Sequence, residues 1–253
     1  MTPSAAPSAG GSWKRDLVLI LGIESATTQV GCAIGGHEGV LASFHSARGQ
    51  RHAETLAPAI DFVRRQALVE FDDLGAIAVD VGPGLFTGLR VGIATAKALA
   101  QTLRVPMIGV SSLDLLAFRV RYTGRLIVAV LDARRGEVFY AFYRQVPGGA
   151  QRLSDYTLGK PADLAWELLA SGEECLVVGD GALRYPTVFS EVARTEFGDL
   201  GDAYPSASAL VELAHPQALR EEFVPSWELK PLYLRKADAE INWETRDRQR
   251  KAG

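Results

Sequence analysis

Cysteine and histidine are scarce in this chain of 253 residues, and neither occurs at a metal-binding spacing. The two cysteines, Cys32 and Cys175, are far apart and form no Cys-x-x-Cys pair, which argues against a structural zinc site and a disulfide framework. The four histidines include no pair four residues apart and no His-Glu-x-x-His motif, so we expect no histidine metal site. Isolated cysteines of this kind are typical of a reducing compartment, and we expect a cytoplasmic protein.

Long apolar runs and a basic surface are also missing. No stretch reaches the length of a membrane span, and residues 1–12 lack the hydrophobic region of a signal peptide, so we expect a disordered leader and no membrane contact. The formal net charge is −3, with basic residues mixed among the acids, which argues against a surface that follows nucleic-acid phosphates. With 47% hydrophobic and 23% charged residues, the composition is that of a globular protein with one large or two modest domains.

Three catalytic signatures are absent from the sequence. There is no GxxxxGK[ST] phosphate loop and no GxGxxG dinucleotide loop. No GxSxG elbow surrounds Ser111 and Ser112, so this pair is interpreted as a helix cap and not as a hydrolase nucleophile.

What the sequence does contain is a strand, a stiff turn and a helix over Val79–Ala100. The apolar run Ala76–Val81 meets the turn Gly82-Pro83-Gly84, and a helical pattern follows at once, with Thr87 as the expected N-cap. A glycine turn before a helix can bind an anion or can simply be a tight corner. The absence of phosphate-loop spacing favours the corner.

The helix after this turn has one apolar side and one side almost without bulk. The small side consists of Gly92, Ala94 and Ala98, which leave room for the backbone of a second helix. The apolar stripe consists of Leu89, Ile93, Ala96, Ala100 and Leu103.

The first half of the chain has the element order βββαβαβα, which predicts an α/β fold. The helix at about 52–67 carries Pro58, which we expect in its first turn. The other expected elements are strands at 17–23, 27–34, 39–45, 76–81 and 105–110 and helices at 87–103 and from Ser111 or Ser112.

The second half begins with the same pattern, which indicates an internal duplication. We expect the boundary near Tyr122–Gly124, and hence halves at 13–122 and 123–235 followed by a charged tail at 236–253. The expected strands are 126–132, 137–143, 152–158 and 175–178, the helices 161–170 and 207–214, and the segment 225–234 is extended.

Four carboxylates follow predicted strands, where open α/β sheets place their ligands. If Glu24, Asp80, Asp132 and Asp180 converge, they could hold magnesium, whereas separately each is an ordinary turn or helix cap. Arg134-Arg135 in the next turn could bind a carboxylate or phosphate, although solvated surface charge is the commoner explanation.

Several segments together resemble one protein family. They are GIESATTQVGCAI, HAETLAPAIDFV, GPGLFTGLRVGIATAKALA, VSSLDLLA and LDARRGEVFYAFY. In these segments the chain resembles the TsaB (YeaZ) family, from about Leu17 to the PLYLR segment at Pro231–Arg235. The resemblance implies an actin-like, Hsp70-like ATPase superfamily fold with two ribonuclease-H-like halves.

The resemblance also implies a non-catalytic paralogue of TsaD without a cofactor of its own. TsaD carries a His-x-x-x-His metal pair, and the matching positions here are Ser112 and Leu116. The glycine run that holds a nucleotide in TsaD is reduced to Gly179-Asp180-Gly181. The residues of a vestigial nucleotide site would be Glu24, Ser25, Asp132, Gly179 and Gly181.

In the family, the first two helices pair with TsaD for threonylcarbamoyl transfer to adenosine 37 of tRNAs that read ANN codons. The ATPase TsaE docks on this heterodimer, tRNA is reached only through the complex, and the isolated chain can self-pair. The expected interface residues are Leu56, Ile60, Val63, Leu89, Arg90, Ile93, Ala94 and Lys97. A nucleotide-binding enzyme and, more remotely, a glycoprotease are the alternatives.

Overall fold

The computed structural model describes residues 18–47 and 52–235. The expected leader at 1–12 and the charged tail at 236–253 lie outside these residues. No helix in the described part of the chain is long and apolar enough to cross a membrane.

The first half is built on a five-stranded sheet with the order β3-β2-β1-β4-β5. Strand β1 is antiparallel to β2 and parallel to β4, so the opening meander and the later strands share one sheet. The strands are β1 (Leu19–Glu24), β2 (Val30–Gly36), β3 (Gly39–Ser46), β4 (Leu74–Gly82) and β5 (Met107–Ser111).

The second half repeats this topology. Its sheet has the order β8-β7-β6-β10-β11, in which β6 takes the place of β1 and is likewise antiparallel to the next strand and parallel to β10. The strands are β6 (Leu126–Arg134), β7 (Glu137–Val146), β8 (Gly149–Arg152), β10 (Cys175–Val178) and β11 (Thr195–Phe197), with β9 (Thr157–Gly159) added beside β7. The predicted duplication into two ribonuclease-H-like halves is therefore confirmed.

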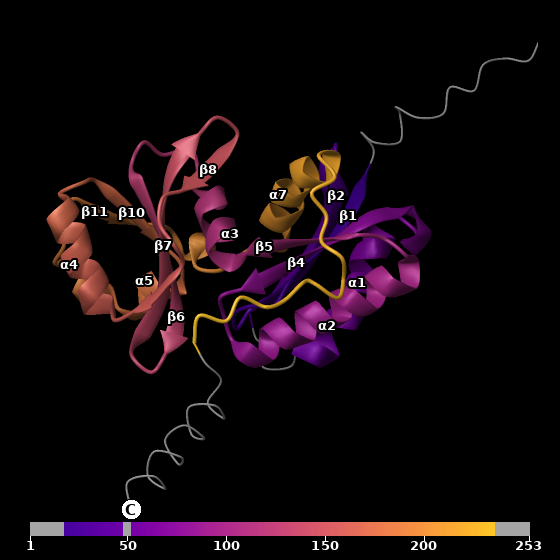
Figure 1. The fold of residues 1–253 in the computed structure, drawn as a ribbon, viewed down its shortest axis with the longest axis horizontal. Coiled ribbons are helices and arrows are strands. Elements are labelled where there is room, and N and C mark those ends of the chain that lie inside the picture. Colours follow the sequence, from indigo (N-terminus) through magenta and orange to yellow (C-terminus); the bar gives the residue numbers. More distant parts are fainter. Residues whose placement is uncertain (1–17, 48–51, 236–253) are drawn as a thin grey trace, which may run out of the picture.

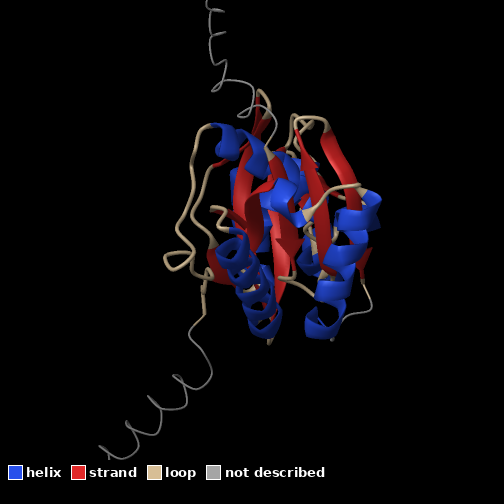
Figure 2. Ribbon diagram, turned by 90° about the vertical axis from the view of Figure 1, so that its right-hand side faces the viewer, coloured by secondary structure: helices blue, strands red, loops and turns tan. Residues whose placement is uncertain are grey.

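Helices cover both faces of the first sheet (Figures 1 and 2). On one face, α1 (His52–Gln66) and α2 (Phe86–Leu103) pack side by side on a core that includes Leu21, Ile23 and Val79. On the other face, α7 (Ala207–Leu219) packs on Ile20, Ala76 and Ala78.

Helix α3 (Ser112–Arg119) lies between the two sheets and joins their cores (Figure 1). Leu115 and Phe118 pack into the first half, whereas Leu113 and Leu116 pack against the second. The second sheet is covered on its outer side by α4 (Pro161–Ser171) and by the short helices α5 (Asp180–Arg184) and α6 (Pro186–Ser190). Two 3₁₀ turns complete the described elements, η1 (Phe71–Asp73) and η2 (Leu200–Asp202).

The end of the described chain belongs to the first half, contrary to the expected halves at 13–122 and 123–235. The close approach of α7 to β1 explains this placement, because a Cβ on Gly22 would lie 3.0 Å from Val211 and 3.1 Å from the Ala207 carbonyl oxygen. The chain then runs back along α2 (Figure 1), burying Leu229 in the first core. Its Leu232 amide donates to the Val81 carbonyl oxygen at 2.7 Å.

Three local predictions were wrong. Pro58 lies inside α1 and not in its first turn, and Thr87 lies inside α2, whose N-cap position is Leu85. The expected strand 152–158 is divided between β8 and β9, because the chain bends at Ser154, whose hydroxyl accepts the Phe142 amide of β7 in place of a backbone carbonyl. The expected cap at Ser111 is correct, since its hydroxyl accepts the Leu113 amide.

Candidate functional site

The corner between β4 and α2 is closed by the chain's own backbone. The Leu85 amide donates to the Ala26 carbonyl oxygen at 2.6 Å, so an amide available to an anion is already used. A Cβ on Gly84 would lie 2.2 Å from that same oxygen, and a Cβ on Gly88 would lie 2.2 Å from the Ser25 carbonyl oxygen. The glycines therefore serve close packing against the turn after β1, as the corner interpretation predicts.

Most of the residues predicted to contact a partner are buried in the chain's own core. Leu56, Ile60, Val63 and Leu89 are at most 3% exposed and Ile93 is 6% exposed, because the stripes of α1 and α2 both face the first sheet. Gly92 is buried as well, against Ser25. These residues offer no surface to a second chain in this structure.

The exposed part of α2 carries the remaining predicted residues. Arg90 and Ala94 are exposed and Lys97 is partly exposed, and Ala98 continues the small side of the helix. Arg90, Ala94 and Lys97 lie at the i, i+4, i+7 spacing that places side chains on one helix face.

Exposed aromatic side chains adjoin this face, and no pattern in the sequence marks them as contact residues. Phe86, at the start of α2, is 46% exposed and stacks on Tyr233, which is 48% exposed, with 5.4 Å between ring centroids. The Arg90 guanidinium lies 4.9 Å from the Phe86 ring centre. Phe62 on α1 is 51% exposed as well, but its ring lies 6.5 Å from that of Phe44 on the edge strand β3. We call Phe86, Arg90, Ala94, Lys97, Ala98 and Tyr233 the α2 face.

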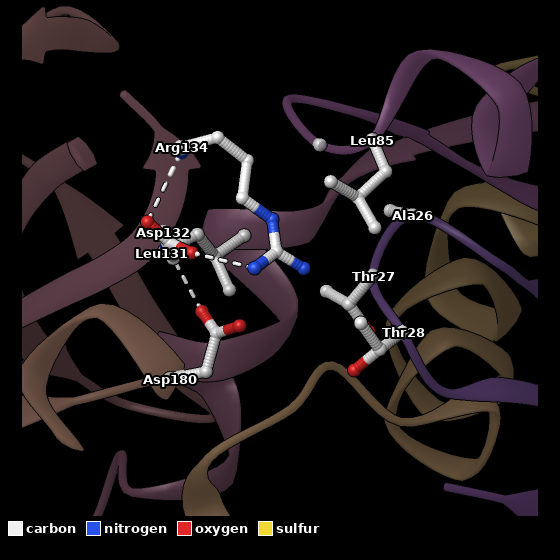
Figure 3. Close-up of a pocket in the computed structure, with 9 residues that line it drawn as sticks. Ala26, Thr27, Thr28, Leu85, Leu131, Asp132, Arg134 and Asp180 are labelled. Atoms are coloured by element: carbon white, nitrogen blue, oxygen red, sulfur yellow. Dashed lines mark hydrogen bonds and ion pairs between the residues drawn. The ribbon is translucent and has the colours of Figure 1, made fainter. Parts of the chain in front are cut away.

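A second candidate site is the cleft between the two halves, shown in Figure 3. Asp132 and Asp180 line one wall, and the turn Ala26–Thr28 with Leu85 lines the other. The Arg134 side chain extends between the walls. The cavity has a volume of about 10 Å³, which is room for about one water molecule.

Asp132 is the centre of the polar contacts in this cleft. It accepts the Arg134 amide at 3.0 Å, and its second oxygen pairs with the guanidinium groups of Arg134 at 3.3 Å and Arg184 at 3.4 Å. The Asp132 amide in turn donates to Asp180 at 2.9 Å. Burial raises the pKa of Asp180 to about 6, although this hydrogen bond opposes the rise.

The glycines of the expected vestigial nucleotide site have a packing role. A Cβ on Gly179 would lie 2.0 Å from the Val130 carbonyl oxygen, and one on Gly181 would lie 2.8 Å from the Val130 side chain. These glycines let α5 approach β6 closely. Arg184 at the end of α5 and Tyr185 directly after it approach Asp132 but were not found from the sequence, because this short helix was not predicted.

The four carboxylates that follow strands do not converge. Glu24 and Asp80 are buried beside each other in the first half, whereas Asp132 and Asp180 face the cleft from the second. Among residues 18–47 and 52–235, no three side chains of His, Cys, Asp or Glu are grouped so that they could hold a metal ion.

The positions matched to the metal-binding histidines of TsaD are both fully buried here. The Ser112 hydroxyl donates to Asp80 Oδ1 at 2.6 Å. Leu116 packs in the core between the halves. Neither side chain reaches the cleft cavity.

Two halves of the same strand order with a cleft between them define a duplicated α/β protein with the actin-like ATPase fold. Residues 41–243 match the family model described as TsaD: tRNA N6-adenosine threonylcarbamoyltransferase. Among curated proteins, the chain is 30% identical over 224 residues to the tRNA threonylcarbamoyladenosine biosynthesis protein TsaB of Bacillus subtilis, covering 88% of this chain and 97% of that protein. The Escherichia coli TsaB protein is 29% identical over 220 residues, or 85% and 94% of the two chains.

Among solved structures, YeaZ from Pseudomonas aeruginosa superimposes with a TM-score of 0.76 at 27% identity. The match covers 86% of this chain and all of that one. The chain belongs to the TsaB (YeaZ) family, within the group that the TsaD model describes.

Proposed function

We propose that this chain is a non-catalytic subunit that pairs with TsaD and supports threonylcarbamoyl transfer to N6 of adenosine 37 in tRNAs reading ANN codons. The relatives named for tRNA threonylcarbamoyladenosine biosynthesis support the pathway. The observation that carries the pairing role is the α2 face, which joins small exposed residues to exposed aromatic ones.

The chemistry of this face suits a helix of a second protein. Ala94 and Ala98 allow close approach of a backbone, while Phe86 and Tyr233 beside them supply apolar area at the N-terminal end of α2. Aromatic residues and arginine are enriched where interfaces gain most of their binding energy. In the absence of TsaD, the same face would pair two copies of this chain.

A supporting rather than catalytic role agrees with the buried state of Ser112 and Leu116. In this proposal, TsaE docks on the heterodimer, and the cytoplasmic tRNA substrate is reached only through the complex. The cleft between the halves gives no support to the nucleotide-binding alternative, because Arg134 is paired with Asp132 inside it and its cavity of about 10 Å³ is far smaller than a ligand pocket.

The substitution Ala94→Glu tests the pairing proposal. The longer, charged glutamate side chain would prevent the close approach of a second backbone that alanine allows, so we expect at least a hundredfold weaker binding to TsaD by isothermal titration calorimetry. The matched control is Ala170→Glu, since Ala170 is also an exposed alanine in a helix but lies on α4 of the other half. If a folded Ala94→Glu variant bound TsaD as tightly as the unmodified chain, the placement of the interface on this face would be wrong.

A further inference from the structure

Two carboxylic acids that the proposed function does not use are buried together in the first half. Glu24 is 0% exposed and Asp80 is 1% exposed. Glu24 is the last residue of β1, and Asp80 lies in the parallel strand β4, two residues before its end. Each is one residue beyond the pair formed by Ile23 and Val79. Side chains alternate along a strand, so both carboxylates point to the face of the sheet that Ala78 also occupies.

Each carboxylate has one oxygen that is satisfied and one that is not. Glu24 Oε1 accepts the Ala26 amide at 2.8 Å, and Asp80 Oδ1 accepts the Gly82 amide at 2.7 Å as well as the Ser112 hydroxyl. Glu24 Oε2 and Asp80 Oδ2 are both buried without a hydrogen-bond partner. A buried, unpaired anionic oxygen is strongly unfavourable, and two of them on adjacent carboxylates are more so.

A single proton would remove one of the two negative charges and also provide the missing hydrogen bond. On either of the unpaired oxygens it would cancel one of the two negative charges and supply a donor for the other carboxylate. We propose that Glu24 and Asp80 share a proton between Oε2 and Oδ2, and that this proton holds the turn after β1 and the corner before α2 together.

The charges and the burial around Glu24 and Asp80 favour a pair that keeps a proton. Burial raises the pKa of Glu24 well above its ordinary value, with the Asp80 charge as the second cause, and burial raises that of Asp80 to about 7. Asp114 on α3 adds a like charge near Asp80. His52 on α1 faces the same turn, with its Nε2 3.0 Å from the Thr27 carbonyl oxygen.

The location gives the proton a structural consequence. Glu24 holds the Ala26 amide, and the Ala26 carbonyl oxygen in turn accepts the Leu85 amide at the N-terminus of α2. Asp80 holds Gly82 at the other side of the same corner. The pair therefore fixes where α2 begins, independently of any partner that α2 binds.

The sign of the pH dependence follows from proton linkage. Between the ordinary carboxyl pKa near 4 and the raised value near 7, the folded chain keeps a proton that the unfolded chain releases. Stability is thus fully present below the lower value and falls as the pH rises through the higher one. One proton changes the folding equilibrium constant up to tenfold per pH unit.

The first test is urea unfolding from about pH 5 to about pH 8 for the unmodified chain, for Glu24→Gln and for the exposed control Asp72→Asn. The neutral amide mimics the protonated acid, so we expect Glu24→Gln to lose up to a tenfold change per pH unit and to gain stability relative to the unmodified chain at the alkaline end. The control should keep the full dependence, because its Glu24–Asp80 pair is intact. The changes that Asp114, Asp180 and His215 contribute are common to all three proteins. An unchanged slope in Glu24→Gln would overturn the proposal.

The second test needs no variant, in case Glu24→Gln does not fold. Carbon-13 NMR of the side-chain carboxyl carbons in the unmodified chain reports their protonation directly. Near neutral pH we expect Glu24 and Asp80 to resonate together at positions between the acid and the carboxylate. Two fully ionised carboxylates at that pH would overturn the proposal.

Discussion

The substitution Gly88→Ala tests the contact that positions α2. At an exposed helix position this change would stabilise the chain by up to about 1 kcal/mol, because alanine is the better helix former. Here the new Cβ would lie 2.2 Å from the Ser25 carbonyl oxygen, which belongs to a buried turn and cannot rotate away.

The expected magnitude follows from two losses at this contact. Overpacking a close-packed site costs about 1–3 kcal/mol. Displacing the Ser25 turn also breaks the hydrogen bond from the Ser25 hydroxyl to the Gly88 carbonyl oxygen, now 2.9 Å long, which contributes about 1 kcal/mol. Set against the gain in helix propensity, the net destabilisation is about 2 kcal/mol.

Urea unfolding measures this change, and thermal unfolding should show a fall in Tm of roughly 4–8 °C. The matched control is Gly149→Ala, since a Cβ at Gly149 meets no atom within 4 Å, and we expect a change within about 0.5 kcal/mol. A Gly88→Ala variant as stable as the unmodified chain would refute the close approach of α2 to this turn.

Two further substitutions test the polar contacts within and between the halves. Tyr143→Phe removes the hydroxyl that donates to the buried Asp114 carboxylate at 2.8 Å and should cost about 2 kcal/mol in urea unfolding, whereas Tyr122→Phe, at an 80% exposed position, should leave stability unchanged. Equal effects of the two would contradict the role of the Asp114 contact. Asp180→Asn keeps an acceptor for the Asp132 amide but removes a carboxyl whose pKa is raised from 3.8 to about 6. In the unmodified chain this carboxyl makes stability fall as the pH rises through that range, by at most about 3 kcal/mol. In the Asn variant this part of the fall should be absent. A decline of the same size in the variant would exclude Asp180 as its source.

The sequence predicts the fold well where a pattern is local. The alternation along Glu137–Tyr143 and the glycine turn after β4 each depend on residues close in the chain, and the elements they predict are present. The duplication follows from the repeated order of such elements.

The return of α7 to the first sheet is a different kind of feature. It depends on Gly22 and Val211, which are almost the whole described chain apart, and no local pattern links them. The same limit applies to the candidate interface. An apolar stripe marks Leu56 and Leu89 as contact residues without saying whether the contact is with the chain's own sheet or with a partner, and here the sheet takes both.

The acid pair shows why buried charge is hard to predict from sequence. Glu24 and Asp80 each follow a strand, which is equally typical of a turn cap or a metal ligand. Only the register of β1 with β4 places them beside each other, and only burial leaves one oxygen of each without a partner.

The central claim is tested most directly by mixing the purified chain with TsaD from the same organism. Size-exclusion chromatography with light scattering is run on each protein alone and on the mixture. The account predicts a new peak with the mass of a heterodimer, formed at the expense of any pairing between copies of this chain. Two proteins that elute separately, with and without ATP and TsaE, would contradict it.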